Sequence, residues 1–137
     1  MLGSRRIWTK RFSREKAQRA QNRDMARIYI AGKITGMDAA AAYELFLAAE
    51  NLLMFHGHTP LNPMKLVDQA EGRKYGEYLA DALRVLLTQA EGVYFLDNYR
   101  DSRGAMIERY IAKTLEIPMY FTAEALPIGS DWPERKD

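Results

Sequence analysis

One glutamate stands out because it falls where a helix is expected to bury carbon. Residues 93–108 run from a short apolar stretch through a polar loop into the start of a helix. At 3.6 residues per turn, the inward side of the helix expected at 104–116 carries five residues: Gly104, Ile107, Glu108, Ile111 and Leu115. An ionised carboxylate is costly to bury alone. Glu108 is therefore expected to be partnered, neutralised or placed at the mouth of a cleft, and a cleft would make it a functional residue.

Two loops after predicted strands have the composition of a ligand site. Gly32 ends the first strand, and the loop from Lys33 to Gly36 follows it, so backbone amides there could cradle a phosphate. Such a cradle needs no side chain, and solvent exposure is the simpler interpretation of Lys33. The second loop, 97–103, follows another strand and leads into the helix that carries Glu108.

The elements that must position these residues alternate along the chain. We predict strands at 27–32, 58–61, 93–96 and 117–121, with helices at 38–56, 62–72, 75–90 and 104–116. This alternation predicts an α/β fold with a doubly wound, flavodoxin- or Rossmann-like parallel sheet of four to five strands, in the order 2-1-3-4. Ligands of such sheets bind beyond the carboxyl ends of strands 1 and 3, where both loops lie.

The two faces of the helix expected at 75–90 are also predicted. Its inward residues would be Leu79, Leu83, Leu86, Leu87 and Ala90. Asp81 faces away from most of these leucines, so it can be read as a solvated carboxylate.

Composition limits the class of protein. The 137 residues suit one domain, cysteine is absent, and the only two histidines are His56 and His58, so we expect neither a disulfide nor a metal site. No apolar run reaches about 18 residues, and the amino-terminal charges are not followed by an apolar segment. We therefore expect a cytoplasmic protein without a membrane span.

Charge divides the chain into an arm, a body and a tail. Residues 1–27 carry a net charge of +7 and residues 28–137 carry −5. We interpret 1–26 as a basic arm, 27–122 as the domain and 123–137 as a tail that docks through Leu126, Ile128 and Trp132. The arm has no groove-reading motif, so we expect it to serve homo-oligomer assembly or remain solvated, and we do not expect a nucleic-acid partner.

The residues at the ends of three predicted strands resemble a known family. Strand 1 contains Tyr29-Ile-Ala-Gly32 and is followed by Thr35-Gly36, Asn62-Pro63 follows strand 2, and Ser102-Arg-Gly-Ala-Met-Ile-Glu108 follows strand 3. Over roughly residues 28–121 these motifs resemble the nucleoside 2-deoxyribosyltransferase-like superfamily, and within it the small phage and bacterial branch DUF4406.

This resemblance implies an enzyme that cleaves or exchanges the N-glycosidic bond of a nucleoside or nucleoside 5′-monophosphate, without a metal or cofactor. By motif position, Glu108 would attack the anomeric carbon, Tyr29 would hydrogen-bond it, and Asp81 would assist the departing base. The implied substrate-binding residues are Gly32, Lys33, Thr35, Gly36, Asn62, Tyr99, Ser102 and Gly104. Among these, Ser102 would hold the phosphate.

Alternatives remain open at this point. Tyr29 could be a packed strand aromatic, and Tyr99 stands where the DUF4406 branch commonly has a tryptophan. The chain could be a nucleotide-binding module without turnover. It could also be a phosphoribohydrolase of the lysine-decarboxylase-like type, although that family usually shows a double glycine ahead of the Gly-x-x-x-Glu motif, where this chain has Asp101-Ser102-Arg103.

Overall fold

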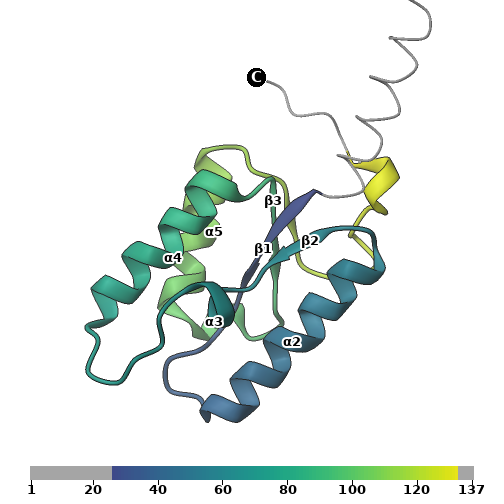
Figure 1. Cartoon of the computed structure of the whole chain (residues 1–137). Helices are drawn as coiled ribbons and strands as arrows, with labels where there is room; N and C mark the ends of the chain where they lie inside the picture. Colours follow the sequence, from purple (N-terminus) through teal and green to yellow (C-terminus); the bar gives the residue numbers. More distant parts are fainter. Residues whose placement is uncertain (1–25, 133–137) are drawn as a thin grey trace, which may run out of the picture.

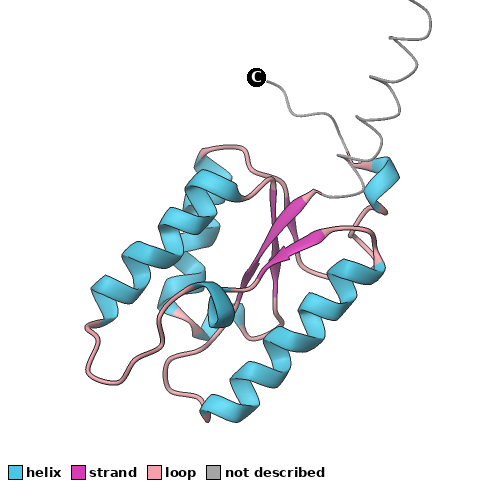
Figure 2. Cartoon of the chain, viewed as in Figure 1, coloured by secondary structure: helices cyan, strands magenta, loops and turns pink. Residues whose placement is uncertain are grey.

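Strands and helices alternate along residues 26–132, the part of the chain that this computed structural model describes (Figures 1 and 2). The strands are β1 (Arg27–Ala31), β2 (Thr59–Leu61), β3 (Gly92–Phe95) and β4 (Met119–Tyr120). The helices are α2 (Ala39–Phe55), α3 (Pro63–Leu66), α4 (Tyr75–Gln89) and α5 (Arg103–Thr114), with short 3₁₀ turns η1 (Tyr99–Asp101) and η2 (Gly129–Asp131). All neighbouring strands are parallel, and their order β2-β1-β3-β4 confirms the predicted doubly wound fold.

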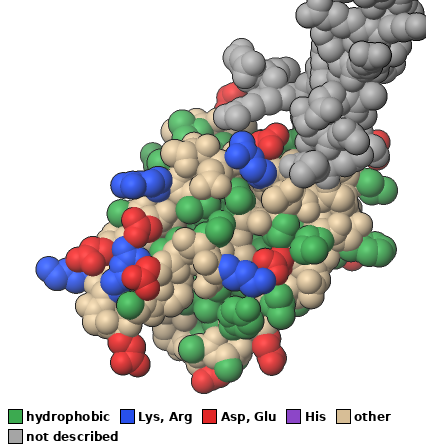
Figure 3. Space-filling view, viewed as in Figure 1, with side chains coloured by type: hydrophobic (Ala, Val, Ile, Leu, Met, Phe, Trp, Pro, Cys, Tyr) green, Lys and Arg blue, Asp and Glu red, His purple; other side chains and the backbone are tan. Residues whose placement is uncertain are grey.

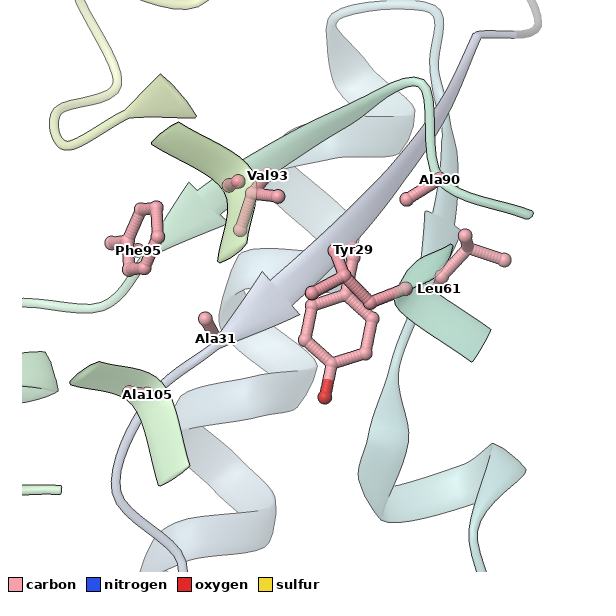
Figure 4. Packing of buried hydrophobic residues seen from close by; sticks show 9 residues of the cluster. Tyr29, Ala31, Leu61, Ala90, Val93, Phe95 and Ala105 are labelled. Carbon is pink, nitrogen blue, oxygen red and sulfur yellow. The ribbon is translucent and has the colours of Figure 1, made fainter. Parts of the chain in front are cut away.

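The sheet separates two apolar layers. One core cluster packs Tyr29, Val93 and Phe95 against residues of α4 and α5, and part of it is drawn in Figure 4. The other packs Ile28 and Ile30 against α2 and the carboxyl-terminal segment. The helices in Figure 1 lie accordingly, with α2 on one side of the strands and α4 and α5 on the other. Successive residues of β1 thus face opposite layers, as the period of a strand requires.

Helix starts follow their capping residues. Asp38 Oδ2 accepts a hydrogen bond from Ala41 N at 3.1 Å, and Asn62 caps α3 with Pro63 at its first position. Ser102 caps α5, which begins one residue earlier than predicted. The helix expected at 62–72 is shorter, because α3 ends at Leu66.

The buried faces of two helices differ from the prediction. In α5, alanines face the sheet beside Glu108, whereas Ile107 and Leu115 are exposed. In α4, Ala82 and Leu86 are buried and Leu87 is exposed. Both helices carry more apolar side chains than one face can hold, so some of the residues predicted to face inward remain exposed.

The segment after β4 docks on the α2 layer. Leu126 and Trp132 are buried in that core cluster, while Ile128 remains 59% exposed. His58 Nε2 lies 2.7 Å from the carbonyl oxygen of Pro127, and the rings of His58 and Trp132 meet edge to face with centroids 5.2 Å apart. Two of the three predicted anchors therefore pack against the domain.

We expect Trp132→Ala to lower the free energy of unfolding by about 3–5 kcal/mol, because it removes a buried aromatic side chain and leaves a cavity. Ile128→Ala in the same segment is the matched control and should change stability by less than about 0.5 kcal/mol. Urea denaturation of both variants measures the difference. Equal midpoints would show that the docked segment does not contribute to the core.

Several predictions concern features outside this description. Residues 1–25 of the basic arm and residues 133–137 of the tail lie outside residues 26–132. None of the helices within that range is both long and apolar enough to span a membrane. Cytoplasmic location and homo-oligomer formation stay predictions.

On the face drawn in Figure 3, Lys and Arg side chains alternate with Asp and Glu and do not form a continuous basic patch.

Candidate active site

Glu108 lies on the face of α5 that packs against the sheet, with only 5% of its surface exposed. Ala105 and Ala112, one turn on either side, are also buried and allow the helix to lie close to the strands. The Oε2 atom of Glu108 is buried and makes no hydrogen bond within the described residues. The expected burial of a carboxylate in this helix is confirmed.

Tyr29, in the middle of β1, reaches Glu108 from the sheet. Its ring packs among the apolar residues of the core, and its hydroxyl lies at the end farthest from the strand (Figure 4). That hydroxyl donates a hydrogen bond to the Glu108 carboxylate. Burial, and next the neighbouring carboxylate, raise the pKa of Tyr29 well above its ordinary value, so the hydroxyl stays a donor.

Burial raises the pKa of Glu108 to about 8, and the hydrogen bond from Tyr29 partly opposes this effect. The carboxyl group is therefore mostly protonated at neutral pH in the free protein. Glu108 also affects the pKa values of two tyrosines of α4. Burial and then Glu108 raise the pKa of Tyr75, and burial is the main cause that raises the pKa of Tyr78 to about 12. Perturbed titratable groups that gather in a cleft are typical of functional sites.

A cavity of about 370 Å³ opens over Glu108 beside the ends of β1 and α5. This volume is within the range of small-molecule sites, about 300–1,000 Å³. Its lining residues are Tyr29, Ile30, Gly32, Lys33, Ile34, Thr35, Gly36, Pro63, Tyr75, Tyr78, Leu79, Ala82, Asp101, Ser102, Arg103, Gly104, Ala105 and Glu108. The switch point predicted from strand order is therefore hollow.

The loops that follow β1 and β3 lie unusually close together. A Cβ atom placed on Gly32 would come within 2.6 Å of Leu96 Cδ1, so this close approach requires glycine. Leu96 N donates to Ala31 O at 2.8 Å, and Lys33 N donates to Asn98 Oδ1 at 3.0 Å. The edge of the cavity is thus fixed by bonds between segments far apart in the sequence.

The amino-terminal end of α5 can hold an anion. Ser102 Oγ accepts a hydrogen bond from Ala105 N at 3.1 Å, which leaves the hydroxyl hydrogen available to a ligand. Lys33 and Arg103 contribute cations to the lining. Helix dipole, glycine-rich loop and two cations together favour a phosphate or carboxylate at this end of the cavity.

The structure brings most of the predicted site residues into this lining: Tyr29, Gly32, Lys33, Thr35, Gly36, Ser102, Gly104 and Glu108. Asp81 lies outside it, with its side chain 43% exposed and ion-paired with Arg73. The predicted role of Asp81 with the departing base would require it to leave Arg73 and turn towards the cavity.

Asn62 and Tyr99 also lie outside the cavity lining. Asn62 is buried, and its Oδ1 accepts a hydrogen bond from Met64 N at 3.0 Å, which caps α3. Tyr99 packs against Phe95 and Phe121 with ring centroids 5.3 and 5.2 Å away. The structure uses both as packing and capping residues.

Ten lining residues were not among the predicted site residues, and three of these, Tyr75, Tyr78 and Arg103, carry a hydroxyl or a cation. Tyr75 and Tyr78 stand three residues apart on the first turns of α4, a spacing that places both on one helix face. Arg103 lies inside the motif between Ser102 and Gly104. Tyr75 is held near α5, since a Cβ on Gly104 would come within 2.9 Å of its hydroxyl.

No cluster of three or more His, Asp or Glu side chains suited to a metal ion occurs between residues 26 and 132. Within the cavity lining, the carboxylates are those of Glu108 and Asp101. The lining offers a buried carboxylate, tyrosine hydroxyls and an end that suits an anion.

The model of a family described as a domain of unknown function, DUF4406, matches residues 26–121. The chain belongs to the DUF4406 family. The match covers β1 to β4 and includes every lining residue of the cavity. The phage origin of the predicted branch stays a prediction.

A solved structure with a similar fold is a 2-deoxyribosyltransferase from the psychrotolerant bacterium Bacillus psychrosaccharolyticus. It is 22% identical to this DUF4406 protein, the similarity covers 69% of each chain, and the TM-score is 0.52. A search of curated proteins finds no match. The family match confirms the predicted DUF4406 membership, and the likeness to this deoxyribosyltransferase shows a shared fold.

Proposed function

We propose that this DUF4406 protein cleaves or exchanges the N-glycosidic bond of a nucleoside or nucleoside 5′-monophosphate, with Glu108 as the nucleophile. The observation that carries the proposal is a buried carboxylate with an unpartnered oxygen in a cavity whose other end suits an anion. The shared fold with a 2-deoxyribosyltransferase supports the same reaction class.

The proposed reaction needs a carboxylate beneath the anomeric carbon. As the bond from C1′ to the base nitrogen breaks, its electron pair leaves with the base and positive charge develops at C1′. A Glu108 oxygen then bonds to C1′ and forms a glycosyl-enzyme ester. Attack by water releases the free sugar and restores Glu108, whereas attack by a second base gives a new nucleoside.

Glu108 must be ionised to attack, although burial keeps it mostly protonated at neutral pH. The hydrogen bond from Tyr29 favours the ionised form and fixes the orientation of the carboxylate. The departing base needs a proton or a hydrogen bond, and Tyr75 and Tyr78 supply hydroxyls in the lining. The acid role of Asp81 stays a prediction.

The direct test is incubation of the purified chain with a panel of nucleosides and nucleoside 5′-monophosphates of both sugars, with free base measured by chromatography. Release of base that depends on Glu108 supports the proposal. Binding of a nucleotide without base release would instead identify a binding module. Release restricted to ribonucleoside monophosphates would favour the phosphoribohydrolase.

We expect monophosphates to react better than the corresponding nucleosides, because Ser102 and the amino-terminal end of α5 offer hydrogen bonds to phosphate. Ser102→Ala should reduce this preference by about 10- to 100-fold, the range for a charge-assisted hydrogen bond. Values of kcat/KM for a matched pair of substrates measure it.

The alanine variant also loses the cap of α5, so Ser102→Gly is the matched control, since glycine is tolerated at this position. Both variants should lose the preference for phosphate to the same degree. Equal kcat/KM for monophosphate and nucleoside in the wild type would show that the anion end is not used.

A further inference from the structure

Asn98 directs its side chain away from the helix that it precedes. It is the N-cap residue of η1, where asparagine ordinarily accepts a hydrogen bond from the helix that follows, yet its side chain makes no such bond. Oδ1 instead accepts a hydrogen bond from Lys33 N at 3.0 Å, and Nδ2 lies 3.5 Å from Met37 Sδ. One side chain therefore joins the loop after β3 to the loop after β1.

This bridge lies just beyond the end of the sheet. The last paired residues of β1 and β3 are Ala31 and Phe95, and Leu96 N donates the final backbone bond to Ala31 O. Lys33 follows where the strands no longer pair, and its amide bonds to the Asn98 side chain. Asn98 thus extends the connection between the two strand ends past the last backbone bond.

The joined loops both border the cavity, whereas Asn98 does not line it. Lys33, Thr35 and Gly36 belong to one loop, and Ser102 and Arg103 belong to the other. A ligand in the cavity would therefore contact both loops without contacting Asn98. Any effect of Asn98 on ligand binding must act through the positions of these loops.

We propose that Asn98 is a positioning residue that holds the loop at 32–36 in the shape that receives the anionic end of the substrate. The nature of the substrate rests on the proposed function, whereas the bridge itself does not. A loop that is already ordered loses less entropy when a ligand binds. Loss of the bridge therefore weakens binding of phosphate-bearing ligands more than it slows the chemical step at Glu108.

The first experiment measures amide hydrogen exchange at Lys33 by NMR in the wild type, Asn98→Ala and Asn98→Asp. The alanine variant removes the acceptor, so exchange at Lys33 should become at least tenfold faster. The aspartate variant keeps an acceptor oxygen and should restore slow exchange. Asn51→Ala, an exposed asparagine of α2, is the control and should leave Lys33 unchanged.

The second experiment measures kcat and KM for a deoxynucleoside 5′-monophosphate and its nucleoside. Asn98→Ala should raise KM for the monophosphate about tenfold, the effect of one lost hydrogen bond, and change kcat less than twofold. KM for the nucleoside should change less than threefold. This split separates positioning of the anion loop from a general loss of folded structure.

Two outcomes would overturn the inference. One is unchanged exchange at Lys33 in Asn98→Ala, and the other is an equal loss of kcat on both substrates. If the wild type releases no base from any substrate, the proposed function fails. Exchange at Lys33, with the affinity for inorganic phosphate measured by calorimetry, then decides the role of Asn98 separately.

Discussion

Glu108→Gln is expected to reduce base release from a nucleoside 5′-monophosphate by at least a thousandfold. Glutamine has the size of the protonated glutamate, so the cavity should keep its shape while the nucleophilic oxygen is lost. Single-turnover assays with free base measured by chromatography give the rate. Glu44→Gln, an exposed residue of α2, is the control and should keep the wild-type rate.

The pH dependence of kcat/KM in the wild type tests the nucleophilic role of Glu108 independently. Since the nucleophile must be ionised and the pKa of Glu108 is about 8, kcat/KM should rise with pH up to this value and then level off. A rate that falls as pH rises from 6 to 8 would assign Glu108 to a general acid. Turnover of Glu108→Gln above a tenth of the wild-type rate would exclude the nucleophilic role.

The second large effect concerns stability. Because the pKa of Glu108 is higher in the folded protein than in the unfolded chain, the folded state binds more protons between about pH 4.5 and 8. The contribution of Glu108 to the free energy of unfolding of the wild type is fully present below pH 4.5 and is lost as the pH rises towards 8. At about 1.4 kcal/mol per pKa unit, the loss in the free energy of unfolding amounts to at most about 5 kcal/mol.

Glu108→Gln has no such titration. Its free energy of unfolding relative to the wild type should therefore increase steadily from pH 5 to pH 9, with most of the change before pH 8. Urea denaturation at several pH values measures the difference, and Glu44→Gln should show no trend. A difference independent of pH would mean that water or a bound cation already stabilises the ionised carboxylate.

The sequence by itself determined the order of the elements and the edge of the sheet at which the cavity opens. Alternating strands and helices allow a parallel sheet with right-handed crossovers, and this restricts the topology to a few arrangements. Capping residues such as Asp38 and Ser102 mark the starts of helices because their bonds reach only three residues along the chain. The helical period of α5 was sufficient to predict that Glu108 is buried. Position 108 lies on the core side whether that side is drawn through the isoleucines, as predicted, or through the alanines, as observed.

Only the tertiary structure decided which partner each polar side chain has. Asp81 pairs with Arg73, Tyr99 joins the ring cluster of Phe95 and Phe121, and Asn98 bonds across to the loop after β1. Nothing in the local sequence distinguishes these choices from a capping, stacking or catalytic role. Each depends on atoms that the fold brings together from distant positions in the chain.

Contacts between distant parts of the chain also decide which face of each helix is buried. Ile107 and Leu87 satisfy an apolar period as well as Ala105 and Ala82, so pattern alone does not fix the rotation of a helix about its axis. That rotation is set by how closely the helix can approach the sheet, and small side chains allow the closest approach. In α5 this rotation also places the Glu108 carboxylate beside the hydroxyl of Tyr29.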